Sequence, residues 1–218
     1  MKLYILTILT IVILASCNNN QATQTEEAQT TLTSTEGDSF SLDVTNSVIN
    51  WEGSSLSGSH NGTLTLKEGF LKSKDGQIVS GSFVLDMASI KDLDLVDVTK
   101  NGYLVGHLND TDFFDTKKFP IGTFEITSIE KIENDSLGNN HKISGNLTLK
   151  GISKNISFPA NVNISETSIS AKGEVVIDRL QWGITYRSST AFPSLKAKLK
   201  DNAINDNIKV ALNIVANK

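Results

Sequence analysis

The chain has 218 residues, of which 39% are hydrophobic and 20% are charged, and its formal net charge is −4. This length suits one domain after a leader segment, and the single cysteine excludes an intramolecular disulfide. An acidic chain without a cluster of basic residues does not suit nucleic acid, so no nucleic-acid partner is expected.

Residues 1–16 have the layout of a secretory signal peptide. Lys2 precedes an apolar run of 12 residues from Leu3 to Leu14, and two small residues then lead to Cys17. A helix that spans a bilayer needs about 20 apolar residues. The run therefore predicts a leader that is removed, and not a transmembrane anchor.

The small residues before Cys17 resemble the lipobox of bacterial lipoproteins. The resemblance implies that Cys17 becomes the acylated first residue of a protein attached to the membrane of the cell envelope. Two or more acyl chains make such anchoring stable. In lipoprotein sorting, an aspartate after the acylated cysteine favours retention in the inner membrane. This chain has Asn18 at that position, so we expect it at the outer membrane, on the periplasmic or the surface face. The alternative is an ordinary signal peptide followed by an unmodified thiol.

Residues 17–38 are expected to form a flexible tether that begins at the lipidated Cys17. The segment holds one large apolar residue, Leu32, and no aromatic residue. Such a composition cannot bury enough apolar surface to offset the entropy lost on ordering. About 20 residues of flexible coil reach on the order of 25 Å, enough to hold a small domain away from a membrane.

Residues 39–218 are expected to form one all-β domain. Apolar residues alternate with polar ones in eight or nine segments, which predicts antiparallel strands with one polar face. Lys74-Asp75-Gly76 and Lys150-Gly151 are typical of tight turns. Strands in this number indicate a closed barrel or a sandwich.

Two stretches interrupt the alternation, 90–119 and 192–207. In the first, Leu104, His107 and Leu108 have the spacing of one helical face. Both stretches are expected to form short helical or loop caps over one end of a barrel.

Several segments, in this order, resemble the YceI-like proteins, also called the polyisoprenoid-binding, lipocalin-like family. They are 47–53, 58–64, 81–90, 104–115, 118–120, 123–124, 145–154 and 177–184. The resemblance implies an extended, eight-stranded antiparallel barrel whose lumen binds a polyisoprenoid or fatty-acid-like lipid, without catalytic machinery or a cofactor. Gln181 and Arg187 depart from the family pattern, which has an acidic residue or lysine at the first position and glycine at the second.

The candidate ligand-binding residues are aromatic side chains and two polar residues near the lumen or its mouth. They are Trp51, Phe83, His107, Phe113, Phe114, Phe124, Phe158, Trp182 and Arg187. Small residues at inward positions, such as Gly81, Gly145 and Ala171, are expected to leave volume for a ligand. The alternative is a filled barrel, in which the same aromatic residues form an ordinary core.

No spacing typical of a metal site or a catalytic triad is present, so neither a metal nor an enzymatic activity is expected. Arg179 is expected to form a structural ion pair with Asp178 or Asp86. The leading hypothesis is a lipid-binding envelope lipoprotein that carries or stores its ligand. A structural or stress-protective barrel and an enzyme acting on lipids are the alternatives, and pairing of two barrels into a homodimer stays open.

Overall fold

The computed structural model describes residues 21–133, 135–199 and 202–218. The expected signal peptide and Cys17 lie outside this part of the chain. Among the described residues, none of the helices has the length and apolar character needed to cross a bilayer.

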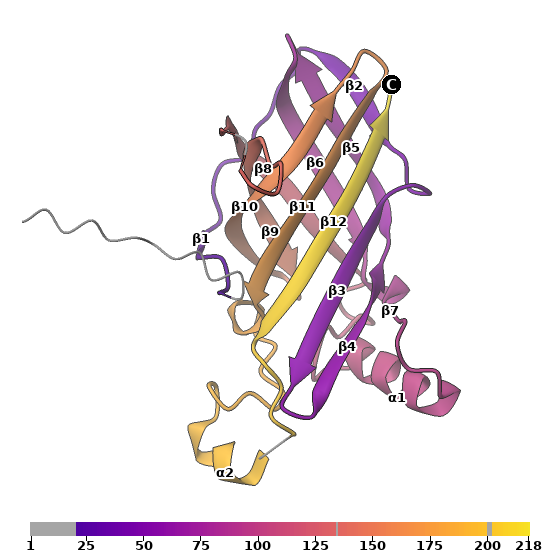
Figure 1. Cartoon of the computed structure of the whole chain (residues 1–218), viewed down its shortest axis with the longest axis vertical. Helices are drawn as coiled ribbons and strands as arrows, with labels where there is room; N and C mark the ends of the chain where they lie inside the picture. The colour runs from indigo at the N-terminus through magenta and orange to yellow at the C-terminus, as the bar shows by residue number, and fades with distance from the viewer. Residues whose placement is uncertain (1–20, 134, 200–201) are drawn as a thin grey trace, which may run out of the picture.

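The fold is an elongated, closed antiparallel barrel of eight strands, which confirms the predicted fold class (Figure 1). Two of the eight strands are each formed by two consecutive elements. β2 (Asp38–Leu42) continues into β3 (Val48–Ser55), and β4 (Gly58–Leu64) continues into β5 (Leu66–Lys74). The other six are β6 (Gln77–Asp86), β8 (Ile121–Lys131), β9 (His141–Leu149), β10 (Ile152–Ile164), β11 (Ser168–Asp178) and β12 (Asn207–Asn217).

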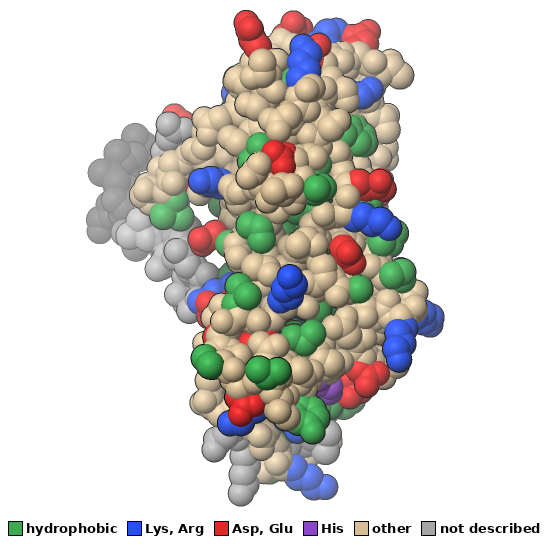
Figure 2. Space-filling model, turned by 90° about the vertical axis from the view of Figure 1, so that its right-hand side faces the viewer, with side chains coloured by type: hydrophobic (Ala, Val, Ile, Leu, Met, Phe, Trp, Pro, Cys, Tyr) green, Lys and Arg blue, Asp and Glu red, His purple; other side chains and the backbone are tan. Residues whose placement is uncertain are grey.

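The first and last strands close the barrel. Ala216 of β12 pairs with Leu42 of β2, and Leu212 pairs with Ile49 of β3. Closure leaves no free edge along most of the sheet, which removes a surface prone to aggregation. Because apolar and polar residues alternate along the strands, polar side chains point out of the barrel. On the face shown in Figure 2, acidic and basic side chains are interspersed.

The two predicted tight turns join neighbouring strands. Asp75 and Gly76 between β5 and β6 have φ of 52° and 70°, and Lys150 and Gly151 between β9 and β10 have φ of 50° and 75°. Two consecutive residues with positive φ are the signature of a type I′ turn, whose twist matches that of the flanking strands.

The two predicted interruptions form the caps at the lower end of the barrel in Figure 1. Between β6 and β8 lie η1 (Met87–Ser89), β7 (Lys91–Asp92) and α1 (Val98–Asn109). Between β11 and β12 lie η2 (Arg179–Trp182), η3 (Pro193–Leu195) and α2 (Lys196–Leu199). The Asp97 side chain caps α1 by accepting hydrogen bonds from the backbone N–H groups of Thr99 and Lys100.

The flexible tether expected before the barrel is not found over residues 21–38. We call residues 21–37 the N-terminal belt, because they cross the outside of the barrel before β2. Within the belt, β1 (Thr25–Glu27) pairs with Lys154–Ile156 of β10. Further along, the backbone N–H of Gln29 donates to Asn146 Oδ1 at 2.9 Å, and Asn146 Nδ2 donates to the backbone carbonyl of Gln29 at 2.7 Å.

The belt is ordered because it crosses two places where neighbouring strands separate. β10 and β11 pair only over 160–164 and 169–173, and the Thr23 N–H bonds the Val176 carbonyl beyond that stretch. Similarly, β6 and β8 pair only over 82–86 and 121–125. There the Leu32 N–H donates to the Ile126 carbonyl, and the Leu32 carbonyl accepts a hydrogen bond from Ser80 Oγ. Backbone hydrogen bonds thus order a segment that composition alone assigns to coil.

Candidate functional site

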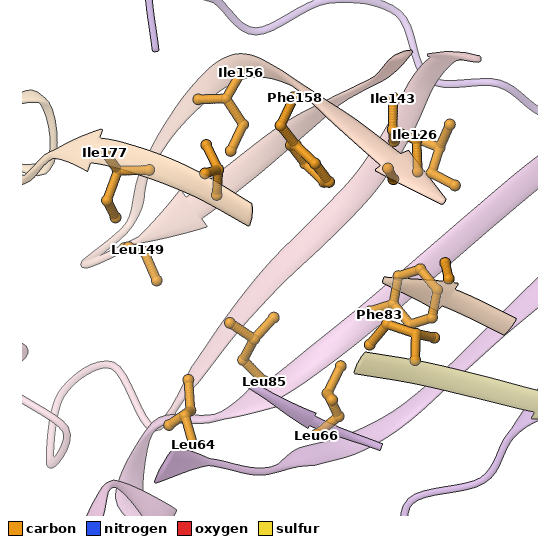
Figure 3. Close-up of a cluster of buried hydrophobic side chains, with 14 of the residues drawn as sticks. Leu64, Leu66, Phe83, Leu85, Ile126, Ile143, Leu149, Ile156, Phe158 and Ile177 are labelled. Atoms are coloured by element: carbon orange, nitrogen blue, oxygen red, sulfur yellow. The ribbon is translucent and has the colours of Figure 1, made fainter. Parts of the chain in front are cut away.

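The inside of the barrel holds a cavity of about 260 Å³. Its walls are almost entirely apolar and come from every strand of the barrel, as well as from the caps. Figure 3 shows how Leu66, Leu85, Ile126, Ile156 and Ile177 converge on the interior from opposite walls. The interior is therefore neither a polar channel nor a completely packed core.

Seven of the predicted ligand-binding residues lie in the cavity wall. These are Trp51, Phe83, Phe113, Phe114, Phe124, Phe158 and Trp182. Phe124 and Phe158 face each other with ring centroids 5.9 Å apart. The sequence thus identified the aromatic part of the wall, whereas a role for these residues in binding a ligand stays a prediction.

The other two predicted residues, His107 and Arg187, are not among the cavity-lining residues. The His107 ring packs edge-on against Phe113 and Tyr186, with centroids 5.1 Å and 4.5 Å away. This contact joins α1 to the segment after η2, so His107 holds the two caps together. The exposed Arg187 guanidinium lies 5.2 Å from the Tyr186 ring centroid.

Arg187 has φ of 50°, in the left-handed region that favours glycine. The resemblance to the family led us to expect glycine at this position, and the backbone conformation found here is one that glycine adopts readily. A head-group role for Arg187 stays a prediction.

The inward glycines do not create the cavity, contrary to expectation. A Cβ at Gly81 would lie 2.7 Å from side-chain atoms of both Ile126 and Leu71, and a Cβ at Gly145 would collide with the Phe124 ring. Larger neighbours already occupy the space that these glycines leave. Ala171, in contrast, lies in the cavity wall, as expected.

The two tryptophans differ in how their indole N–H groups are satisfied. Trp182 is fully buried, and its Nε1 donates to the Leu147 carbonyl at 3.0 Å. Trp51 Nε1 is buried in the cavity wall and has no hydrogen-bond partner. The nitrogen is not accessible from the cavity, so its unpaired N–H costs the fold about 1–3 kcal/mol.

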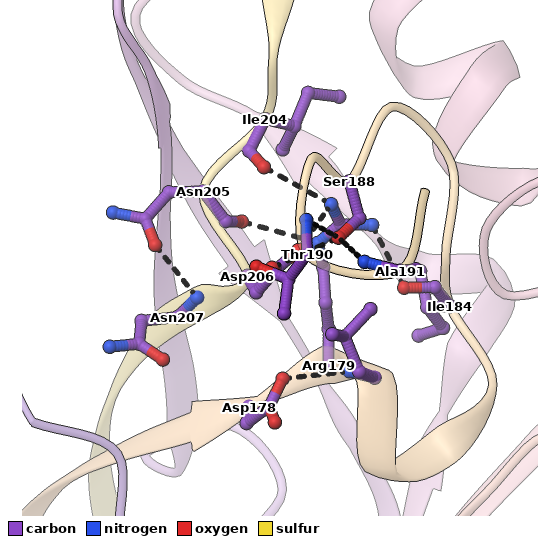
Figure 4. A network of polar contacts seen from close by, with 11 residues as sticks. Asp178, Arg179, Ile184, Ser188, Thr190, Ala191, Ile204, Asn205, Asp206 and Asn207 are labelled. Carbon is purple, nitrogen blue, oxygen red and sulfur yellow. Dashed lines mark hydrogen bonds and ion pairs between the residues drawn. The ribbon is translucent and has the colours of Figure 1, made fainter. Parts of the chain in front are cut away.

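Arg179, which is 2% exposed, lies at the centre of a polar network under the second cap (Figure 4). Its guanidinium donates to the carbonyls of Ile184, Ile204 and Asn205 and forms an ion pair of 2.9 Å with Asp206. The expected pairing with Asp178 or Asp86 is therefore wrong. Burial lowers the pKa of Arg179, and the charge of Asp206 opposes that shift.

Asp206 also anchors the loop that follows η2. Its Oδ2 accepts a hydrogen bond of 3.0 Å from Ser188 Oγ, and Ser188 Oγ accepts from the N–H groups of Thr190 and Ala191. Sequence reasoning missed both Asp206 and Ser188. The contact between buried Ser188, partly buried Asp206 and Arg179 is a long-range feature that no local pattern indicates.

Comparison with known proteins identifies a family profile described as a YceI-like domain, which matches residues 40–216. No curated protein matches the sequence.

Three solved structures have similar folds. BcnA of Burkholderia cenocepacia is 18% identical with a TM-score of 0.59, and the match covers 80% of this chain and 99% of BcnA. A polyisoprenoid-binding domain from Saccharophagus degradans, implicated in plant cell wall breakdown, is 18% identical with a TM-score of 0.56 and coverages of 82% and 97%. The Campylobacter jejuni YceI protein is 18% identical with a TM-score of 0.51 and coverages of 100% and 99%. At these identities the likeness shows a shared fold.

Proposed function

The chain belongs to the YceI-like family, and we propose that it is a lipid-anchored envelope protein that binds a polyisoprenoid or fatty-acid-like lipid inside its barrel, for carriage or storage. The observation that carries this proposal is the apolar cavity of about 260 Å³. A dry apolar cavity of about 150 Å³ already accommodates benzene. The polyisoprenoid-binding domain of Saccharophagus degradans, which shares the fold, supports the same class of ligand.

Apolar burial alone supplies enough free energy for useful affinity. Each buried methylene contributes roughly 0.8 kcal/mol, so ten buried carbons contribute on the order of 8 kcal/mol before ordering costs.

Mass spectrometry of the bound lipid tests the proposal directly. The protein is purified from membranes of its own host and extracted with organic solvent, beside a mock preparation from cells that lack it. We expect one class of long-chain lipid, near one molecule per chain. An extract identical to the mock, together with no uptake of long-chain lipid by the purified protein, would refute lipid binding.

The N-terminal belt limits how far a lipid on Cys17 could lie from the barrel. The belt bonds the barrel from Thr23 onward, so six peptide units separate its first bonded residue from Cys17, and they span at most about 22 Å. A lipid on Cys17 would therefore keep the β10 and β11 side of the barrel near the bilayer. This is a shorter reach than a free tether of 20 residues would give.

Replacement of Cys17 with alanine should move the protein out of the membrane fraction. Without the thiol there is no acylation site, so the product is released or keeps its uncleaved signal peptide and migrates more slowly. Fractionation and immunoblotting measure both outcomes, and Asn20→Ala serves as the neighbouring control. A Cys17→Ala protein that fractionates and migrates like the wild type would contradict the lipoprotein hypothesis.

A further inference from the structure

Three polar side chains converge beside the first cap, where β4 meets β7. His60 of β4, Asp92 of β7 and Asp94 bring one nitrogen and two carboxylate oxygens within 4.8 Å of one another. His60 Nδ1 lies 2.9 Å from Asp94 Oδ2 and 4.0 Å from Asp92 Oδ2. The pairing of Gly62 with Asp92 fixes this arrangement in the sheet.

Asp92 is the unusual member of the cluster. Its side chain is 0% exposed, and its Oδ1 accepts hydrogen bonds from the Leu95 N–H and from Asn101 Nδ2. Its Oδ2 is buried, has no hydrogen-bond partner, and points into the cluster. The hydrogen bond between His60 and Asp94 gives each of those side chains a partner, but Asp92 Oδ2 still has none. Buried carboxylates are normally paired or bound to a metal.

The surrounding contacts hold the other acidic group in place as well. Asp94 Oδ1 accepts a hydrogen bond of 2.7 Å from the Asn61 N–H, which leaves Oδ2 facing His60. Hydrogen bonds that orient the ligand side chains are typical of metal sites.

We propose that His60, Asp92 and Asp94 bind a divalent transition-metal ion of the Zn²⁺ or Mn²⁺ type. An imidazole nitrogen with two carboxylate oxygens suits such borderline ions. No local spacing indicates this site, because 32 positions separate His60 from Asp92 in the sequence. His60 also lines the cavity, so the bound ion would place positive charge at one end of the lumen.

Calorimetric titration with Zn²⁺ and with Mn²⁺ tests the site. The protein is the full chain with Cys17→Ser and a histidine-free affinity tag, so that neither thiol nor tag binds metal. We expect the wild type to bind one ion per chain. Asp92→Asn should bind at least one of the two ions about 100-fold more weakly. Metal should raise the melting temperature of the wild type but not that of the variant. Asn keeps the acceptor for Leu95, and Asp94→Asn replaces this variant if Asp92→Asn fails to fold.

His141→Gln is the matched control, because His141 lies in β9, far from the cluster in the sheet order, and should leave affinity unchanged. Anomalous diffraction from crystals soaked in the metal should place the ion between the three side chains. Equal affinity in wild type and Asp92→Asn, no measurable binding, or an anomalous peak elsewhere would each overturn the proposal.

Discussion

Replacement of Arg179 with glutamine should lower the free energy of unfolding by about 3–5 kcal/mol. The substitution removes the charge that pairs with Asp206 and three donors that satisfy backbone carbonyls under the second cap. Since the arginine is buried, water does not replace these contacts. Chemical denaturation followed by circular dichroism measures the change.

Arg187→Gln is the matched control, because it removes the same charge from an exposed residue eight positions away. We expect it to change the free energy of unfolding by less than about 0.5 kcal/mol. Equal effects of the two substitutions would show that net charge, and not the buried network, determines stability here.

Replacement of Leu212 with tryptophan should abolish most lipid binding while leaving the barrel folded. Leu212 lies in the cavity wall on β12, where an indole would occupy space available to a ligand. Displacing about four methylenes costs roughly 3 kcal/mol, which corresponds to about 100-fold weaker binding. Titration with a fluorescent fatty-acid analogue measures the affinity.

Ala211→Trp adds an indole at the neighbouring position, which faces the outside of the barrel, and should leave the affinity unchanged. The unfolding free energy of Leu212→Trp should stay the same or rise, because the new side chain fills a cavity. Retained binding in a folded Leu212→Trp protein would mean that the ligand lies outside the lumen.

Local sequence patterns predicted an antiparallel barrel or sandwich and much of the cavity wall, and the family resemblance favoured the barrel. In β11, Ile169, Ala171, Val175 and Ile177 stand at positions of the same parity, and all four are buried, whereas the residues of the other parity are polar except for Val176. A period of two determines which face of a strand is buried, so each inward residue can be identified without its partners. The helical spacing of Leu104 and Leu108 likewise predicted α1.

Features that depend on distant partners could not be predicted in this way. The Ile126 carbonyl accepts the Leu32 N–H next to a register shift between β8 and β9, an irregularity absent from the apolar pattern. Asp206 lies 27 residues from Arg179, and nothing nearby marks it as the partner. The cavity depends on how side chains pack across the barrel, which composition does not determine.

The order in which the chain is synthesised gives the N-terminal belt a further consequence. Thr23 bonds Ser157, 134 residues later, and the first barrel strand pairs with Ala216 and Asn217 near the end of the chain. At about 5–20 residues per second, the belt waits on the order of 10 s for its partners. Contacts so distant in sequence also form slowly. The belt is therefore fixed only after β10 and β11 have been made, and the barrel closes later still, when β12 pairs with β2.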